Sequence, residues 1–308
     1  AATLPWASAS DWRRAPRAGR PEGALLRREP PAPRGCAEQV ATNYRKLLTE
    51  PRGRLYEDEH VSATFSLTST SVEAAGSFCC SFELVVAASC GQGHPGGGAQ
   101  EVCLEPAADA LPRQPSVRLL VEPVHGPRGS AAFRGRLEAL SPYEASPQVD
   151  LSYLLPDGLR CRARFRLPLP VSRLLEPAPN ISASQFQTLW CSPEFARAEF
   201  CCVCDVQPAF LAPGGLYWYA KGLELRGLLA SLPGFDGAPH SVALATLFRP
   251  FSGRASGGVF PGPEILVRAE LGGPSGKEAV CRLTVRSGSH LLNRGLARVL
   301  LDTLCGPA

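Results

Sequence analysis

An alternating pattern in residues 149–167 constrains the fold of this chain more than any other feature. Residues 149–154 alternate apolar with polar side chains, and residues 160–167 carry an arginine at every second position up to Arg166. The turn sequence Pro156-Asp157-Gly158 separates the two runs. Because successive side chains of a strand point to opposite faces, the pattern predicts an antiparallel hairpin with one buried face and one solvated face.

Comparable short runs, separated by glycine, proline and aspartate, recur through the first half of the chain. The expected strands cover residues 63–68, 78–86 and 117–121. Strands spaced by turns, with almost no helical periodicity, predict an all-β antiparallel sandwich over residues 36–168. The glycine- and proline-rich segment 91–98 is expected to be an exposed loop between strands.

The pattern changes after residue 168. Ser182 can cap a helix, and Gln185 three residues later completes a capping box, so a helix through Trp190 is expected. Further strands are expected at residues 241–248, 264–271 and 280–286, followed by an amphipathic helix from about Ser289. Residues 169–308 are therefore predicted to form an α+β platform, an antiparallel sheet with flanking helices.

Composition narrows the functional class. The length of 308 residues favours about two domains, and a formal net charge of +4 with 19% charged residues gives no case for nucleic-acid binding. No apolar run approaches the roughly 18 residues of a membrane span, so no membrane insertion is expected. Many of the 12 cysteines lie at apolar-looking positions, which is typical of the reduced thiols of a cytosolic protein.

The start of the sequence suggests a fragment. The chain contains no methionine and begins with Ala1, so we interpret it as a C-terminal piece of a larger protein. Residues 1–35 show no apolar periodicity and include a proline- and arginine-rich run, which predicts a flexible hinge or linker.

Sequence motifs give little support for an enzyme. The string Gly91-Gln92-Gly93-His94-Pro95-Gly96 matches a dinucleotide fingerprint but lacks the following helix that would hold a pyrophosphate. Cys201 and Cys204 form a single Cys-x-x-Cys pair without a second pair or histidines at ligand spacing, which favours a buried thiol cluster over zinc. The acidic run Glu57-Asp58-Glu59 is interpreted as a solvated turn. We expect no catalytic residues, cofactor or metal.

One group of residues suggests a peptide-docking surface. Phe186 and Trp190 stand four apart and share a face of the expected helix. Alternating positions of the later strands place polar side chains on one sheet face: Arg268, Glu270, Arg282 and Arg286. An aromatic beside guanidinium groups suits a peptide that carries a carboxylate next to an aromatic residue. The alternative interpretations are core packing for Trp190 and a solvated face for the arginines.

Several longer segments are specific enough to indicate a protein family. They are residues 149–153, 164–170, 174–177, 185–190 and 281–287, with a weaker one at 43–57. From about Cys36 to its end, the chain resembles on these segments the C-terminal appendage, or ear, of alpha-adaptin, the large subunit of the plasma-membrane clathrin adaptor complex. The resemblance implies an immunoglobulin-like sandwich followed by a platform that captures short linear motifs of accessory proteins, such as Asp-Pro-Phe and Asp-Pro-Trp.

The resemblance also implies a site and a setting. The motif-binding residues would be Phe186, Gln187, Trp190, Arg268, Glu270, Arg282 and Arg286. Gln187 stands where the family has a second aromatic, so one wall of the pocket would be polar. The partners would be endocytic accessory proteins, and other adaptor subunits through an N-terminal trunk outside this sequence. The location would be the cytosol and the cytoplasmic face of the plasma membrane, in clathrin-coated pits.

Two other hypotheses remain open at this stage. In the first, the same fold is the ear of another adaptor or coat subunit and serves different motif partners. In the second, the protein is a hydrolase with a degenerate motif, or a metal protein that uses the cysteines between Cys201 and Cys204.

Overall fold

A computed structural model describes most of the chain. The described residues are 34–72, 77–89, 99–107, 117–126, 130–177, 181–211, 214–225, 229–232, 241–248, 265–272 and 280–305. Residues 1–33 of the expected linker and the expected loop 91–98 lie outside them. Within the described residues, the chain divides between Arg173 and Leu174 into two compact units.

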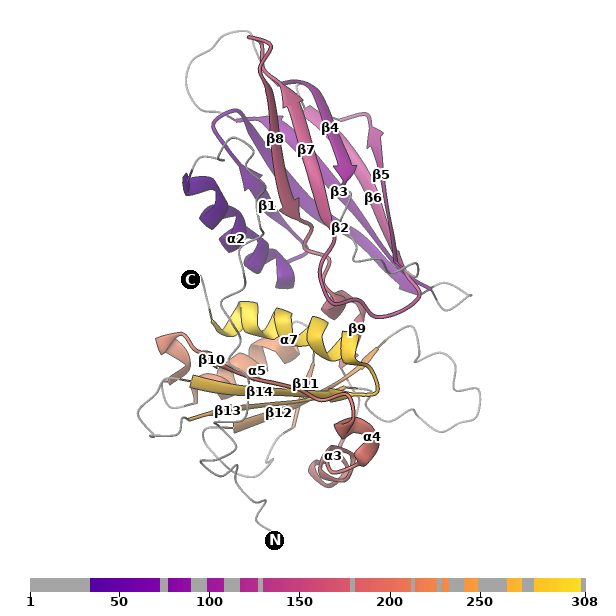
Figure 1. Ribbon diagram of the computed structural model, residues 1–308, viewed down its shortest axis with the longest axis vertical. Helices are drawn as coiled ribbons and strands as arrows, with labels where there is room; N and C mark the ends of the chain where they lie inside the picture. The colour runs from indigo at the N-terminus through magenta and orange to yellow at the C-terminus, as the bar shows by residue number, and fades with distance from the viewer. Residues whose placement is uncertain are drawn as a thin grey trace. The chain divides into compact units, whose positions relative to one another are not determined.

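The N-terminal unit consists mainly of two antiparallel sheets (Figure 1). Its helix is α2 (Arg34–Thr49), and its strands are β1 (Arg52–Glu57), β2 (Val61–Val72), β3 (Phe78–Ala88), β4 (Gln100–Pro106), β5 (Val117–Val124), β6 (Ser130–Ala139), β7 (Gln148–Leu154) and β8 (Arg160–Arg166). One sheet has the order β1-β2-β3-β6-β5 and the other β4-β7-β8. Mostly antiparallel β-structure with few helices is compatible with a β-sandwich.

Aromatic side chains fill the space between these two sheets. Tyr56 of β1 stacks on Phe165 of β8, with ring centroids 5.6 Å apart. Phe65 and Phe82 stack within the larger sheet at 5.7 Å, and both are fully buried. Gly135 of β6 faces Phe82 so closely that a Cβ there would lie 1.9 Å from the ring, so only glycine fits beside this ring.

Helix α2 was not expected from the sequence. The sequence predicts that residues 34 and 35 belong to the linker and the following residues to the sandwich. Val40, Tyr44, Leu47 and Leu48 nevertheless follow helical spacing, and Leu47 and Leu48 are almost fully buried. The helix precedes β1 and packs against it.

The C-terminal unit is built on a six-stranded antiparallel sheet with the order β10-β14-β13-β12-β11, in which β9 also pairs with β12. Its strands are β9 (Leu175–Pro177), β10 (Phe200–Asp205), β11 (Ala230–Ser231), β12 (Ser241–Phe248), β13 (Ile265–Leu271) and β14 (Val280–Ser287). Its α-helices are α3 (Ala183–Trp190), α4 (Pro193–Ala196), α5 (Gly215–Leu225) and α7 (His290–Leu304). A 3-10 turn at Val171–Leu174 spans the point where the chain divides, and another lies at Pro208–Leu211 in this unit.

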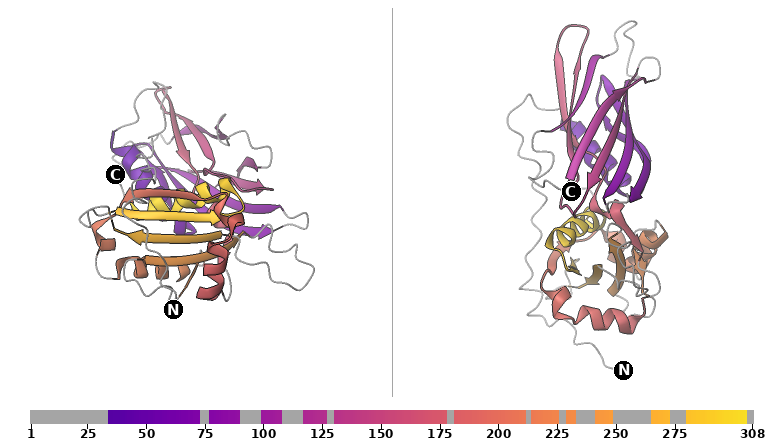
Figure 2. Two further views of the ribbon diagram at one scale, coloured as in Figure 1. Left: turned by 60° about the horizontal axis from the view of Figure 1, so that its bottom comes forward. Right: turned by 90° about the vertical axis from the view of Figure 1, so that its right-hand side faces the viewer.

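Helices cover both faces of this sheet. Figures 1 and 2 show α7 on one face, with α3 and α4 at one end of the other. Tyr219 of α5 hydrogen-bonds Thr303 of α7 at 2.6 Å, which joins these two helices. The expected strands at 241–248, 264–271 and 280–286 and the closing helix agree closely with β12, β13, β14 and α7, whereas β10 and α5 were not expected.

Candidate functional site

Helix α3 holds the two aromatic residues that the sequence singles out. Its predicted capping box is present: the backbone N–H of Gln185 donates to the Ser182 hydroxyl at 3.2 Å, and the Ser182 N–H donates to the Gln185 side chain at 2.9 Å. This cap fixes the start of the helix and therefore the face on which Phe186 and Trp190 lie. Their rings stack with centroids 5.4 Å apart and planes 15° apart.

The two aromatics differ in exposure. Phe186 is 0% exposed at the centre of an apolar cluster. The other buried members are Leu232, Ala243, Ala245, Leu247 and Leu266. Trp190 packs against the edge of this cluster and is only partly buried. Phe186 therefore supports the indole from inside and would act on a ligand through Trp190, which is the partly exposed residue of the two.

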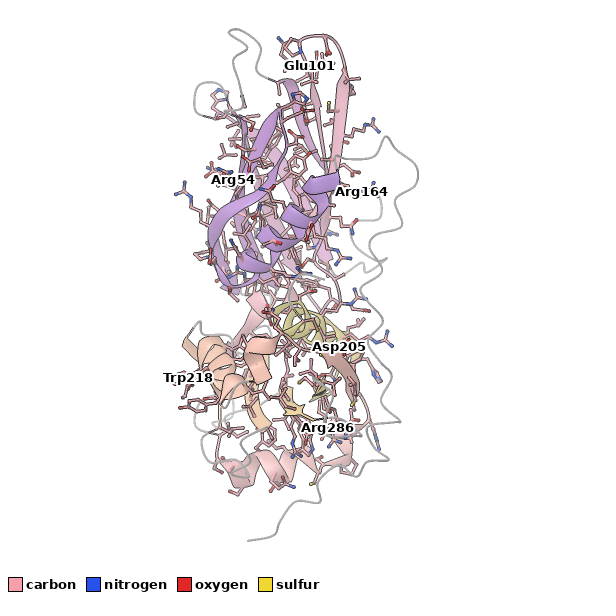
Figure 3. All side chains as sticks on the ribbon, turned by 90° about the vertical axis from the view of Figure 1, so that its left-hand side faces the viewer. Arg54, Glu101, Arg164, Asp205, Trp218 and Arg286 are labelled. Atoms are coloured by element: carbon pink, nitrogen blue, oxygen red, sulfur yellow. The ribbon has the colours of Figure 1, made fainter. Side chains whose placement is uncertain are left out.

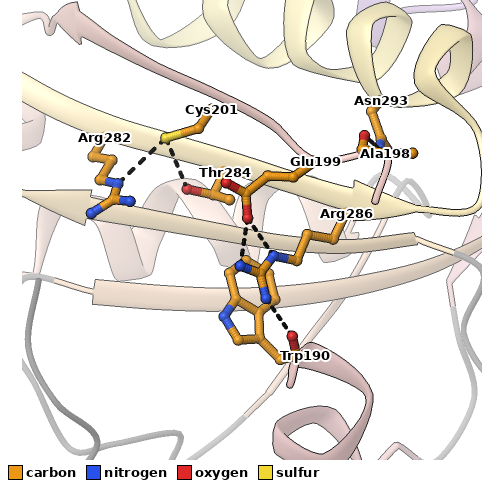
Figure 4. Close-up of polar contacts among 8 residues, drawn as sticks. All are labelled: Trp190, Ala198, Glu199, Cys201, Arg282, Thr284, Arg286 and Asn293. Atoms are coloured by element: carbon orange, nitrogen blue, oxygen red, sulfur yellow. Dashed lines mark hydrogen bonds and ion pairs between the residues drawn. The ribbon is translucent and has the colours of Figure 1, made fainter. Parts of the chain in front are cut away.

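A guanidinium lies over the indole (Figure 4). The Cζ of Arg286, on β14, is 4.4 Å from the Trp190 ring centroid, a cation–π distance. Arg286 also donates from Nε to the Glu199 carboxylate at 2.6 Å and from Nη1 to the carbonyl of Trp190. Segments far apart in the sequence thus meet at this indole, and the guanidinium is held at three points.

The segment that carries Glu199 is itself anchored. Asn293 of α7 is fully buried and donates from its side-chain amide to the carbonyl of Ala198 (Figure 4). Because Ala198 directly precedes Glu199, this hydrogen bond positions the carboxylate that orients Arg286. A side chain from the opposite face of the sheet therefore contributes to the geometry around Trp190.

The other predicted site residues follow along the same sheet face. Strand register places Leu266 opposite Arg286, Arg268 opposite Thr284, and Glu270 opposite Arg282. Arg268 and Glu270 form an ion pair at 3.2 Å with side chains only 11% and 10% exposed, so their charges largely offset one another away from solvent. Nε of Arg282 points to the sulfur of Cys201 at 3.4 Å.

Gln187 lies on α3 between the two aromatics and is partly buried. Its amide nitrogen donates to the Cys191 sulfur at 3.1 Å, and its buried side-chain oxygen has no hydrogen-bond partner among the described residues. The position that the resemblance assigns to an aromatic is thus occupied by a polar group with an unused acceptor.

Replacing Arg286 with lysine is expected to lower the free energy of unfolding of the C-terminal unit by about 1–2 kcal/mol. A lysine ammonium cannot hold the Glu199 carboxylate, the Trp190 carbonyl and the indole together in one planar fork. Urea unfolding followed by tryptophan fluorescence checks this. An unchanged midpoint would show that the fork adds nothing beyond a point charge.

The cysteines of β10 do not converge on one point. Strand alternation places Cys201 on the face of Arg282, and Cys202 and Cys204 on the face of α7. The two sulfurs of the Cys-x-x-Cys pair therefore point to opposite sides of the sheet and cannot chelate one ion. Within the described ranges, no group of three or more histidine, cysteine, aspartate or glutamate residues could hold a metal ion.

The buried thiols make stability sensitive to alkali. Burial raises the pKa of Cys202 to about 12, and a hydrogen bond to Cys281 with burial raises that of Cys204 to about 12. Below the thiol pKa of the unfolded chain, these thiols keep their protons in both the folded and the unfolded state. Above it, only the unfolded chain loses them, so the free energy of unfolding falls as the pH rises from about 8.5 towards 12. We expect a loss of about 2 kcal/mol between pH 8 and 9.5 in urea titrations. Cys202→Ala should flatten this slope; an equally steep slope would contradict the assignment.

The acidic run is more than a solvated turn. The Asp58 carboxylate accepts hydrogen bonds from the hydroxyls of Tyr56 at 2.5 Å and Tyr153 at 2.6 Å. It also accepts from the backbone N–H groups of His60 and Val61 at 2.8 and 2.7 Å. Asp58 therefore joins the β1–β2 turn to β7 of the smaller sheet, which corrects the expectation for this residue.

Sequence reasoning missed an exposed aromatic pair on α5. Tyr217 is 51% exposed, and Trp218 is 70% exposed (Figure 3). Their rings meet edge to face with centroids 5.4 Å apart. The helical stripe of Leu216, Ala220 and Leu223 is buried, so the adjacent aromatics fall outside it. That spacing could have shown that Trp218 faces solvent.

Comparisons with known proteins do not identify a family for this chain. No protein-family model matches the chain, and a search of the curated proteins finds no significant match. Among the described helices, none combines the length and the apolar character needed to cross a bilayer.

Proposed function

We propose that this protein is the appendage of an alpha-adaptin-like clathrin adaptor subunit and binds short motifs of the Asp-Pro-Phe or Asp-Pro-Trp type at Trp190. The N-terminal unit would be its immunoglobulin-like sandwich, and the C-terminal unit its motif-binding platform. The proposal rests on the segments that resemble that family. The observation that supports it best is the partly exposed Trp190, whose indole contacts both buried Phe186 and the guanidinium of Arg286.

Binding would use a few contacts. The aromatic side chain of the motif would pack on the solvent-facing part of the indole, where desolvation is favourable and the ring is already held in place. Its carboxylate would share Arg286 with Glu199 or meet Arg282 further along the same strand. Such small contacts are weak singly and gain strength when several motifs and several adaptors engage together.

The setting follows from the same proposal. The partners would be endocytic accessory proteins, and the remaining adaptor subunits would bind through a trunk N-terminal to this sequence. The protein would act at the cytoplasmic face of the plasma membrane in clathrin-coated pits and would catalyse no reaction. Arg268 and Glu270, which pair with each other almost out of solvent, would support the platform and would not contact the motif directly.

Separate substitutions of two tryptophans test the proposed site. Trp190→Ala should leave the unit folded by circular dichroism but reduce the affinity for an Asp-Pro-Phe peptide at least about tenfold in a calorimetric titration, since the aromatic contact is the main hot spot. Trp218→Ala, which removes a more exposed tryptophan of the same unit, should bind like the wild type. Unchanged affinity in Trp190→Ala would remove the proposed site.

A second candidate is the ear of another adaptor or coat subunit. Gln187 favours it, because a polar residue stands at the position where the resemblance assigns a second aromatic. A peptide array that varies the residues flanking the motif's aromatic would separate the two. Preference for Asp-Pro-Phe supports the endocytic adaptor, and preference for motifs with a donor at the Gln187 wall supports the alternative.

A further inference from the structure

Strand β8 carries four arginines on one face. Arg160, Arg162, Arg164 and Arg166 alternate with side chains that turn towards the sandwich interior, and all four are exposed. Figure 3 shows Arg164 projecting outward from this strand. Arg164 forms a forked ion pair with Asp150 at 2.6 and 2.9 Å, and Arg160 lies 3.4 Å from Glu101. The pattern confirms the solvated face that the sequence predicts for this hairpin.

Two of these guanidiniums have no partner among the residues that the structure describes. Within the part of the chain that the structure describes, neither Arg162 nor Arg166 forms a hydrogen bond or an ion pair. Opposite them on β7 stand the uncharged residues Ser152 and Gln148. Strand geometry separates positions four apart by about 13 Å, so two unpaired positive charges stand at fixed spacing along β8.

The backbone of the same residues points to an open edge. Among the described strands, the order β4-β7-β8 leaves β8 with a neighbour on one side only. At one end of the β7–β8 pair, the N–H of Leu155 donates to the carbonyl of Leu159 at 2.9 Å. At the other end, the N–H of Leu167 donates to the carbonyl of Pro147 at 2.8 Å, and the register between the two ends has no shift. These two hydrogen bonds fix the alternation of the antiparallel ladder. The backbone N–H and C=O groups of Cys161, Ala163 and Phe165 therefore point to β7. The N–H and C=O groups of the arginines therefore point to the free edge.

Charge on an edge strand often serves only to prevent aggregation. Here the two guanidiniums without a described partner belong to residues whose backbone groups point to the free edge. We propose that the β8 edge binds an extended acidic segment of a partner protein, which adds as a further strand and places carboxylates four residues apart, opposite Arg162 and Arg166. A nucleic acid or an anionic lipid surface would use the charge but not the outward N–H and C=O groups.

This site lies in the N-terminal unit and is independent of the proposed motif binding at Trp190. Its test uses the full chain and a short fluorescent peptide of alternating glutamate and threonine, read by anisotropy. We expect saturable binding that weakens at least about tenfold in Arg162→Glu/Arg166→Glu. The control Arg118→Glu/Arg134→Glu makes the same charge change at exposed positions of the larger sheet and should bind like the wild type.

A second probe separates strand addition from simple charge attraction without any protein variant. The same peptide, N-methylated at alternate residues, keeps its carboxylates but loses the backbone donors of one edge, and should bind at least about tenfold more weakly. Equal binding of the methylated peptide, equal losses in both double variants, or stronger binding to a single-stranded oligonucleotide or to phosphatidylserine vesicles would overturn the proposal.

Discussion

Replacing Phe186 with alanine is expected to lower the free energy of unfolding of the C-terminal unit by about 3–5 kcal/mol. The ring is 0% exposed and contacts residues of β12 and β13, so its removal leaves a cavity in the core. It also removes the surface on which the Trp190 indole stacks. Urea unfolding followed by tryptophan fluorescence measures the loss, and motif affinity should fall with it although this ring cannot touch a peptide.

Phe186→Leu is the matched control. Leucine retains most of the apolar contact and should cost less than half as much as alanine, at about 1–2 kcal/mol. If alanine and leucine destabilise the unit equally, or if alanine costs less than about 1 kcal/mol, the ring is not the core anchor described above.

Asp58→Ala is expected to destabilise the N-terminal unit by about 3–4 kcal/mol. The substitution removes an acceptor of four hydrogen bonds and leaves the hydroxyls of Tyr56 and Tyr153 without this partner at 6% and 3% exposure. Each buried donor left unsatisfied costs about 1–3 kcal/mol. Thermal or urea unfolding monitored by far-UV circular dichroism gives the measurement.

The neighbouring Glu59 provides a comparison. It is exposed, and among the described residues it pairs only with the imidazole of His60, so Glu59→Ala should change stability by less than about 0.5 kcal/mol. Asp58→Asn, which keeps one oxygen acceptor, should fall between the two alanine variants. Equal effects at positions 58 and 59 would mean that the acidic run is a solvated turn after all.

Local patterns predicted the elements whose signals are contained within a few residues. The hairpin at 149–167 combines strict alternation with a strong turn, and it forms β7 and β8. The start of α3 was predictable because its cap is a contact between Ser182 and Gln185. Strand β6 was missed because its small residues, such as Ala131, Ala132 and Gly135, blur the apolar alternation.

Contacts between distant residues were beyond the same reasoning. Asp58 accepts one of its four hydrogen bonds from Tyr153, which is 95 positions away, and this link to β7 could not be predicted from the local sequence. The burial of Phe186 depends on residues of β12 and β13. The low exposure of the Arg268–Glu270 ion pair depends on how closely that sheet face is covered. Arg286 was expected to orient a peptide, but the sequence could not show that Glu199 and the Trp190 carbonyl would hold it.

The most direct test of motif binding is the response of the Trp190 indole to an Asp-Pro-Phe peptide. In a two-dimensional ¹⁵N–¹H spectrum, the chain's 4 tryptophans each give one indole N–H resonance, and the Trp190→Phe variant assigns the relevant one. We expect this resonance to shift saturably with peptide while that of Trp218 stays in place. An unmoved Trp190 resonance at peptide concentrations that saturate binding would contradict the proposed site.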